Sequence, residues 1–247
     1  AVVRSSRLVK RGTHDDRMQA GVYDLLEKTG ERDWGVNLIG RFNPIPASSE
    51  FMTTLGEWGI STVRSVASCK TFEEYRRIAD SALNLSVSWM GQATVLELQR
   101  KLDIPSLFFK PAYAVDEVDG NYRRLYETLR DIEARTRMAD APRCPWALEP
   151  PSRTSACHAA RVRAEQAVAR AREAIGNIPI ALDTFATFFP FSMACALLGY
   201  GFNVKTVFAL HVKSDDAVAR SQLEQDYPAV QVVAHAKSAM LGEGHAG

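Results

Sequence analysis

The side chains best suited to chemistry lie in loops that each follow a short apolar run. These residues are Arg41, Cys69, Ser88, Trp89 and Gly91. The apolar runs, at residues 36–40, 60–66 and 82–88, are typical of buried strands. In open α/β sheets, ligands bind outside the carboxyl ends of the strands, where such loops gather. The loop after residues 82–88 is therefore the first place to expect a site.

Arg41 and Cys69 each have a functional and a structural interpretation. The guanidinium of Arg41 suits bidentate pairing, so it is a candidate anchor for an anion or a carboxylate. The alternative is an ordinary residue of a surface loop. Cys69 follows the second strand at the same edge of the sheet, where its thiol is a candidate ligand or reactive group. The alternative is a small residue in a strand-to-helix turn.

A loop of unusual aromatic content, FATFFPF at residues 185–191, includes Phe188. Four phenylalanines at a strand-to-helix junction are able to line an apolar pocket for a flat ligand. They are equally able to pack between two domains. Asp183 ends the preceding strand, where its carboxylate either caps the next turn or orients a substrate.

The familiar nucleotide, protease and hydrolase motifs do not occur. The sequence contains no Walker A pattern, no G-x-G-x-x-G, no HExxH and no G-x-S-x-G. The four cysteines are scattered without CxxC spacing, which favours a reducing setting over a disulfide framework.

Alternation of apolar strands with helical patterns predicts the fold class. Strands are expected at residues 36–40, 60–66, 83–88 and 106–109, with helices at residues 17–28, 50–58, 71–81 and 93–102 between or before them. This order is typical of α/β, Rossmann-like parallel sheets with crossover helices. A long helix at 116–137 follows. The pattern then restarts, with strands at residues 178–183, 203–210 and 229–234 and helices at residues 191–198 and 215–226.

Three segments are expected. Residues 1–138 form a Rossmann-like α/β domain, and residues 139–176 form a proline-rich linker with a connecting helix at residues 155–175. Residues 177–247 begin a second Rossmann-like α/β domain that is apparently incomplete.

Composition excludes several function classes. The 247 residues are 46% hydrophobic and 24% charged, with a formal net charge of +1. This balance gives no global field for nucleic acid or a membrane surface. No stretch approaches the roughly 18 apolar residues that a spanning helix needs, and no signal peptide is evident. We therefore expect a cytoplasmic protein that binds neither nucleic acid nor membrane.

Residues 36–129 resemble the nitrogenase component 1 type oxidoreductases. The matching elements are VNLIG, a helix leading to LGEWGI, TFEEYRRIADSALNLSVS, and ELQRKLDIP. The later run IPIALDTFATFFPFSMACALLGYGFNV resembles the start of the last Rossmann-like domain of that family. The resemblance covers most of residues 15–235.

Departures from the family pattern matter for cofactors. Where the family has a cysteine that ligates the metal cluster, this chain has Ser88 or a neighbour in the run Ser86-Val87-Ser88, and serine is a poor ligand for soft metals. The loop at residues 185–191 replaces a glycine-rich, arginine-containing loop of the family. An iron–molybdenum-type cofactor is therefore not expected. An iron–sulfur cluster shared with a partner subunit is implied, with ligands not evident in this chain.

The resemblance implies a nitrogenase-like reductase subunit. Electrons would come from an ATP-dependent iron–sulfur partner protein, and a small-molecule substrate, such as a tetrapyrrole-like macrocycle, would be reduced at an inter-domain cleft beside a homologous subunit. Two alternatives remain open: a non-catalytic scaffold or assembly subunit of the same architecture, and an unrelated Rossmann-like small-molecule binding protein.

Overall fold

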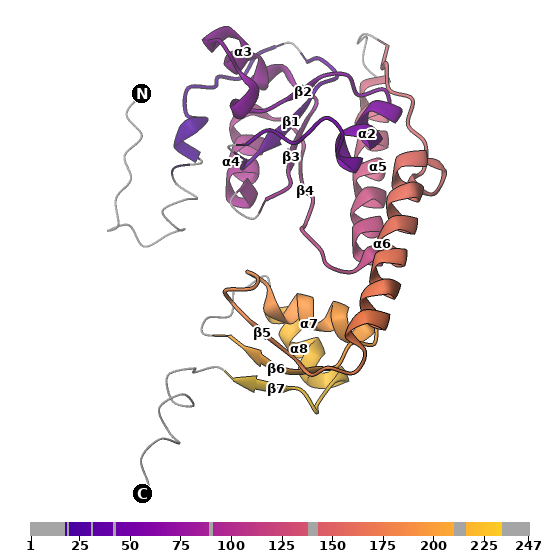
Figure 1. Cartoon of the computed structure of the whole chain (residues 1–247). Coiled ribbons are helices and arrows are strands. Elements are labelled where there is room, and N and C mark those ends of the chain that lie inside the picture. Colours follow the sequence, from indigo (N-terminus) through magenta and orange to yellow (C-terminus); the bar gives the residue numbers. More distant parts are fainter. Residues whose placement is uncertain are drawn as a thin grey trace, which may run out of the picture. The chain divides into compact units, whose positions relative to one another are not determined.

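The computed structural model describes residues 18, 20–30, 32–41, 43–88, 91–137, 143–209 and 216–233 (Figure 1). The chain divides into two compact units. The first comprises Ala1–Pro111 and Asp119–Ala160, and the second comprises Ala112–Val118 and Arg161–Gly247. Whether these units are independent domains with the boundaries expected above stays a prediction.

A four-stranded parallel sheet forms the centre of the first unit. Its strands are β1 (Val36–Ile39), β2 (Val63–Arg64), β3 (Leu83–Ser86) and β4 (Ser106–Phe108), in the order β2-β1-β3-β4. Leu38 of β1 pairs with Leu85 of β3, and Leu85 pairs with Leu107 of β4. Together with the parallel sheet of the second unit, this confirms the predicted α/β fold class.

Helices cover both faces of this sheet (Figure 1). One face carries α3 (Phe72–Arg76), the 3₁₀ turn η2 (Arg77–Asp80) and α4 (Gln92–Leu102). The other carries α2 (Glu50–Glu57) and the part of α5 (Val115–Arg137) that belongs to this unit. Strand order explains the division. The connection from β1 to β2, which contains α2, runs in one direction along the sheet. The connections to β3 and β4, which contain α3 and α4, run in the opposite direction. Because all these crossovers are right-handed, α2 lies on one face and α3 and α4 lie on the other.

Two buried apolar layers hold these helices to the sheet. On the α4 side, the core combines residues of the segment before β1 with residues of α3, η2 and α4. Its members are Tyr23, Leu26, Ile39, Tyr75, Ile78, Ala79, Val95, Leu98, Leu102 and Ile104. On the α5 side, the fully buried Trp58 contacts the ring of Tyr122.

Capping residues fix where two of these helices begin. The hydroxyl of Ser49 accepts the amide of Met52 at the start of α2, and that of Thr71 accepts the amide of Glu74 at the start of α3. The Glu74 carboxylate accepts the amide of Lys70, so it does not complete a capping box with the amide of Thr71.

Two predicted elements are shorter than expected. The strand expected at residues 60–66 pairs only over Val63–Arg64, because Ser65 begins the 3₁₀ turn η1 (Val66–Ser68). Of the helix expected at residues 17–28, the described part beyond residue 22 is turn and coil. Its Tyr23 and Leu26 amides bond three residues back, and both side chains are buried.

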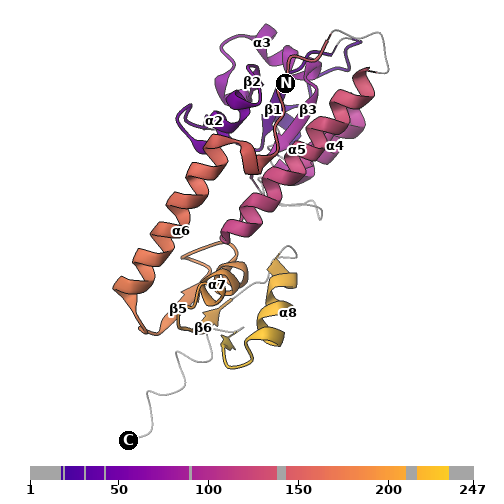
Figure 2. The ribbon, with the colours of Figure 1, turned by 90° about the vertical axis from the view of Figure 1, so that its right-hand side faces the viewer.

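The second unit repeats the architecture on a smaller scale. Its parallel sheet has the order β5 (Ile180–Asp183), β6 (Val204–Phe208), β7 (Gln231–Val233). The crossover helices α7 (Pro190–Gly199) and α8 (Ala217–Asp226) lie side by side against it (Figure 2). A short turn, η4 (Pro151–Arg153), precedes the long helix α6 (Ser155–Ile175). Among the described residues, no helix combines the length and the apolar character that crossing a membrane requires.

Candidate functional site

The strand order of the first unit places a topological switch point between β1 and β3. From β1 the chain runs to β2 on one side, whereas β3 and β4 lie on the other side. The loops after β1 and β3 therefore leave the sheet on opposite faces, and the carboxyl ends of these two strands are where such sheets bind ligands. The same two loops contain four of the residues selected from the sequence, so the fold gives them a physical reason to be near a site.

Gly40 and Gly91 meet at this switch point. Gly40 has a φ of +85°, a conformation that strains residues with a Cβ. A Cβ on Gly40 would lie 2.4 Å from the Cα of Gly91, and one on Gly91 would lie 2.4 Å from the Oγ of Ser86. Glycine is therefore required on both sides of the contact. The loops that bound the switch point pack backbone against backbone.

Ser88 lies in a tight turn between β3 and α4. Its carbonyl oxygen accepts both the hydroxyl of Ser86, at 2.7 Å, and the amide of Gly91, at 3.0 Å. The Ser88 amide in turn donates to the Ser86 hydroxyl at 3.4 Å. Ser86 is fully buried and organises the turn. The sequence pattern named Ser86 only as a neighbour of the position that matches the family ligand, and not as a residue that holds the turn.

Arg41 follows the glycine contact directly. Its side chain is half-buried, and among the described residues the structure gives it no hydrogen bond and no ion pair. Arg32 and Arg64, by contrast, are held by backbone carbonyls and by Asp33, respectively. A guanidinium without a protein partner at a ligand-binding edge is able to receive an anionic group. This geometry favours the anchoring role predicted for Arg41, which remains untested.

Cys69 follows the 3₁₀ turn η1 after β2 and carries a protonated thiol. Its Sγ is 3.2 Å from the carbonyl oxygen of Ser65, to which the thiol donates. Burial raises its pKa, and the Glu74 carboxylate raises it further. The thiol packs against the α4-side core, which includes the buried Tyr23. A protonated thiol is a poor nucleophile and a poor metal ligand.

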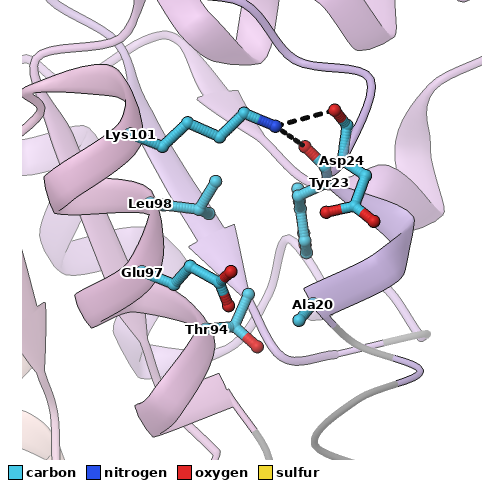
Figure 3. A pocket seen from close by; sticks show the side chains of 7 residues that line it. All are labelled: Ala20, Tyr23, Asp24, Thr94, Glu97, Leu98 and Lys101. Carbon is cyan, nitrogen blue, oxygen red and sulfur yellow. Dashed lines mark hydrogen bonds between the residues drawn. The ribbon is translucent and has the colours of Figure 1, made fainter.

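A small hollow lies next to this region, between residues 20–24 and α4 (Figure 3). Its empty space is about 190 Å³ including open solvent, less than the usual size of a ligand pocket. The ammonium of Lys101 bridges one rim by donating to the carbonyl oxygens of Tyr23 and Asp24. The buried hydroxyl of Thr94 lines the hollow and has no hydrogen-bond partner within the described part of the chain. The hollow suits a water molecule rather than a substrate.

The aromatic loop of the second unit divides its four rings between the core and the surface, with Phe189 and Phe191 buried. Phe185 is 90% exposed and Phe188 is 71% exposed. The carboxylate of Asp183 accepts the amides of Phe185 and Ala186 at 3.0 and 2.7 Å. Of the two roles considered for Asp183, capping of the turn is therefore the one that the hydrogen bonds support.

A buried carboxylate occupies the N-terminus of α7. Asp216, 1% exposed, accepts the amides of Phe191 and Ser192 at 3.0 and 2.9 Å and the hydroxyl of Ser192 at 2.5 Å. Helix N-termini attract anions because their first amides have no partner within the helix. At α7 these amides are already satisfied by the chain itself. The sequence analysis did not identify this role of Asp216.

The structure brings together only some of the predicted site residues. Gly91 and Ser88 share one turn, Arg41 adjoins the glycine contact, and Cys69 lies on the neighbouring turn after β2. Trp89 lies outside the described residues. Phe188 belongs to the second unit. No observation tests the binding role of any of these residues.

The side chains of this region do not fit a thiolate-bound metal cluster. The donors at the β3 turn are the hydroxyls of Ser86 and Ser88, and the neighbouring Cys69 is a hydrogen-bonded thiol. Within the described ranges, no three histidine, cysteine or acidic side chains are grouped so as to hold a metal ion. The implied iron–sulfur cluster therefore has no ligand set among the described residues.

Solved structures of similar fold are nitrogenases. A chain of the structure "Nitrogenase Cp1 at pH 6.5" matches with a TM-score of 0.59 and 15% sequence identity, over 91% of this chain and 50% of that one. A chain of "Nitrogenase Cp1 at pH 5" matches with a TM-score of 0.51 and 12% identity, over 81% and 38%. At these identities the likeness shows the fold alone. This chain therefore spans half the length of the first matching chain and 38% of the second.

A family model gives the more specific comparison. No curated protein matches the chain. The model described as nitrogenase component 1 type oxidoreductase matches residues 11–241, which is most of the sequence. The resemblance seen in the sequence is thereby confirmed, and the chain belongs to the nitrogenase component 1 type oxidoreductase family.

Proposed function

We propose that the chain is a subunit of a nitrogenase-like reductase that binds an anionic organic substrate at the carboxyl edge of the first sheet. The observation that carries the proposal is Arg41, half-buried at the switch point, with no protein partner among the described residues. Family membership supports the redox chemistry. The alternative of an unrelated Rossmann-like protein is not retained, because the family model covers most of the chain.

In this proposal the chain contributes substrate binding and no cluster ligand. The Arg41 guanidinium holds a carboxylate or a similar anionic group of the substrate, and the Gly40–Gly91 contact keeps the two loops in place. An ATP-dependent iron–sulfur protein would supply the electrons, and a homologous subunit would hold any cluster that the reaction needs.

A second candidate is a non-catalytic scaffold or assembly subunit. The specific observation in its favour is the turn at Ser88, where the family ligand is replaced by a hydroxyl and the backbone is tied to Ser86. A scaffold would form the same complexes but would not accept electrons for a substrate.

Arg41→Gln tests the substrate-binding claim. In a reconstituted complex with its partner subunit, we expect this variant to raise the KM for an anionic substrate by about tenfold or more, which corresponds to about 1.4 kcal/mol. The matched control is Arg124→Gln, which removes an exposed arginine on α5 and leaves the KM unchanged. Equal KM values for the two variants would refute the role of Arg41. ATP-dependent substrate reduction by the wild-type complex separates the reductase from the scaffold.

A further inference from the structure

Five aromatic rings of the first unit contact one another in unbroken succession. The ring centroids of Phe51 and Phe109 are 5.8 Å apart, and those of Phe109 and Tyr122 are 5.1 Å apart. Trp58 follows at 6.5 Å from Tyr122, and Tyr126 lies 6.2 Å beyond Trp58. We call these residues the aromatic chain. It begins at the carboxyl edge of β4, where the Phe109 amide donates to the Ser86 carbonyl at 2.8 Å.

Only part of the aromatic chain is readily oxidised. Phenols and indoles lose one electron to moderately strong oxidants, whereas benzene rings do not. The redox-capable segment is therefore Tyr122, Trp58 and Tyr126. Trp58 is fully buried, Tyr122 is 3% exposed, and Tyr126 is half-buried. The segment thus connects the core to the surface through ring contacts short enough for rapid electron transfer.

Tyr122 has the partner that phenol oxidation needs. A phenol that loses an electron becomes a strong acid, so a stable radical forms only where a base takes the proton. The Glu50 carboxylate and the Thr54 hydroxyl lie near the Tyr122 hydroxyl. Glu50 is the first residue of α2 and is therefore fixed by the fold. Burial and this carboxylate raise the pKa of Tyr122, so the phenol is protonated at neutral pH.

Packing alone does not explain the hydroxyl. Phenylalanine would fill the same space between Phe109 and Trp58 without the cost of burying a polar group. The indole of Trp58 also has a fixed partner, since its Nε1–H donates to the Thr154 hydroxyl at 3.0 Å. Trp58 is thus held by a specific hydrogen bond, and Tyr122 lies near a carboxylate.

We propose that Tyr122, Trp58 and Tyr126 form a one-electron relay that carries an oxidising equivalent between the surface and a stable radical site at Tyr122. A one-electron oxidant of the oxygen-radical class removes an electron from Tyr126 or Trp58. Oxidised Trp58 is then reduced by an electron from Tyr122. The Tyr122 hydroxyl proton moves to Glu50, which leaves a neutral tyrosyl radical, a carboxylic acid and the reduced oxidant. The relay uses no metal cluster and is independent of the proposed substrate reduction.

Flash photolysis of the full-length chain tests the relay. The probe is photo-oxidised tris(bipyridine)ruthenium with persulfate as the electron acceptor, and freeze-quench electron paramagnetic resonance detects the product. We expect a neutral tyrosyl radical in the wild type that is mostly lost in Tyr122→Phe. The matched control is Tyr227→Phe, in the second unit, which keeps the signal. Trp58→Phe slows the formation of the Tyr122 radical, and Glu50→Gln shortens its lifetime.

A second measurement tests the radical site without removing the hydroxyl of residue 122. Incorporation of 3,5-difluorotyrosine at position 122 changes the hyperfine pattern if the radical resides there, and leaves it unchanged otherwise. An unchanged pattern, or equal radical yields in Tyr122→Phe and the wild type, would overturn the proposal.

Discussion

Gly40 and Gly91 lie so close at the switch point that neither has room for a side chain. The Cβ that any other residue would place on Gly40 falls 2.4 Å from the Gly91 Cα and 2.6 Å from its amide nitrogen. The contact joins the loop after β1, which leads to Arg41, to the turn after β3, which contains Ser88. The two loops that would bind a ligand are thus held at a fixed separation by backbone contact.

Gly40→Ala is expected to destabilise the first unit by about 1–3 kcal/mol, from positive-φ strain and overpacking. Urea unfolding followed by tryptophan fluorescence measures this effect specifically. All four tryptophans belong to segments of the first unit, so the signal reports on that unit. The matched control is Gly120→Ala in α5, where a Cβ meets nothing within 4 Å. This control is neutral or stabilising by about 0.5–1 kcal/mol. Equal stabilities for the two variants would refute the contact.

Asp216→Ala should loosen the start of α7. The change removes the acceptor for the amides of Phe191 and Ser192, at a cost of about 1–2 kcal/mol for a lost helix cap. Hydrogen–deuterium exchange measures it directly, because those two amides should exchange faster while the amides of α4 in the first unit do not change. Unchanged exchange at Phe191 and Ser192 would show that the carboxylate does not cap the helix.

Alkaline pH should destabilise the first unit. Burial raises the pKa of the Cys157 thiol from an ordinary value of 9.0 to about 11. The unfolded chain therefore loses this proton first, so the stabilisation is complete below pH 9 and is lost as the pH rises from about 9 to about 11. Tyr23 and Tyr122 extend the loss, because burial also raises each pKa. Urea midpoints measured across this range should fall, and Cys157→Ser should make the fall less steep. A midpoint independent of pH above 9 would contradict this expectation.

Asn37→Leu should disrupt a buried polar network. The Asn37 amide donates to the Ile78 carbonyl and to the Asn84 side chain, each at 2.8 Å, and its oxygen accepts the Ser81 hydroxyl at 2.8 Å. Leaving these buried partners unsatisfied costs about 1–3 kcal/mol. Unfolding followed by fluorescence measures it, with Thr128→Ala as the control, which removes an exposed side-chain hydrogen bond on α5 of the same unit. An unchanged unfolding midpoint would contradict this expectation, because it would mean that water satisfies the former partners of Asn37.

The sequence predicted the parallel α/β architecture because strands buried on both faces give continuous apolar runs. VNLI and LNLS became neighbouring central strands. The pairing of Asn37 with Asn84 across them could not be predicted, because hydrogen bonding between strands depends on register. For the same reason, the sequence placed Ser88 and Gly91 in one loop but did not show that Gly91 contacts Gly40.

The candidate site was predicted less completely than the fold. Strand ends located Arg41, Cys69 and Ser88 at one edge of the sheet, since parallel strands share that edge. Whether an arginine has a partner, or a thiol donates to a carbonyl, depends on contacts between segments far apart in the chain. The carboxylate of Asp216 at α7 is of this kind, because 24 residues separate it from Ser192.

The most direct test of the reductase proposal is electron acceptance that depends on ATP. The chain, assembled with its homologous partner subunit, is mixed anaerobically with the reduced ATP-dependent iron–sulfur protein. The paramagnetic signal of that donor is then followed before and after ATP is added. We predict that ATP triggers oxidation of the donor, and that Cys69→Ser and Ser88→Ala retain it because neither residue ligates a cluster. If the donor stays reduced after ATP addition, the reductase proposal is contradicted and the scaffold or assembly role is the remaining candidate.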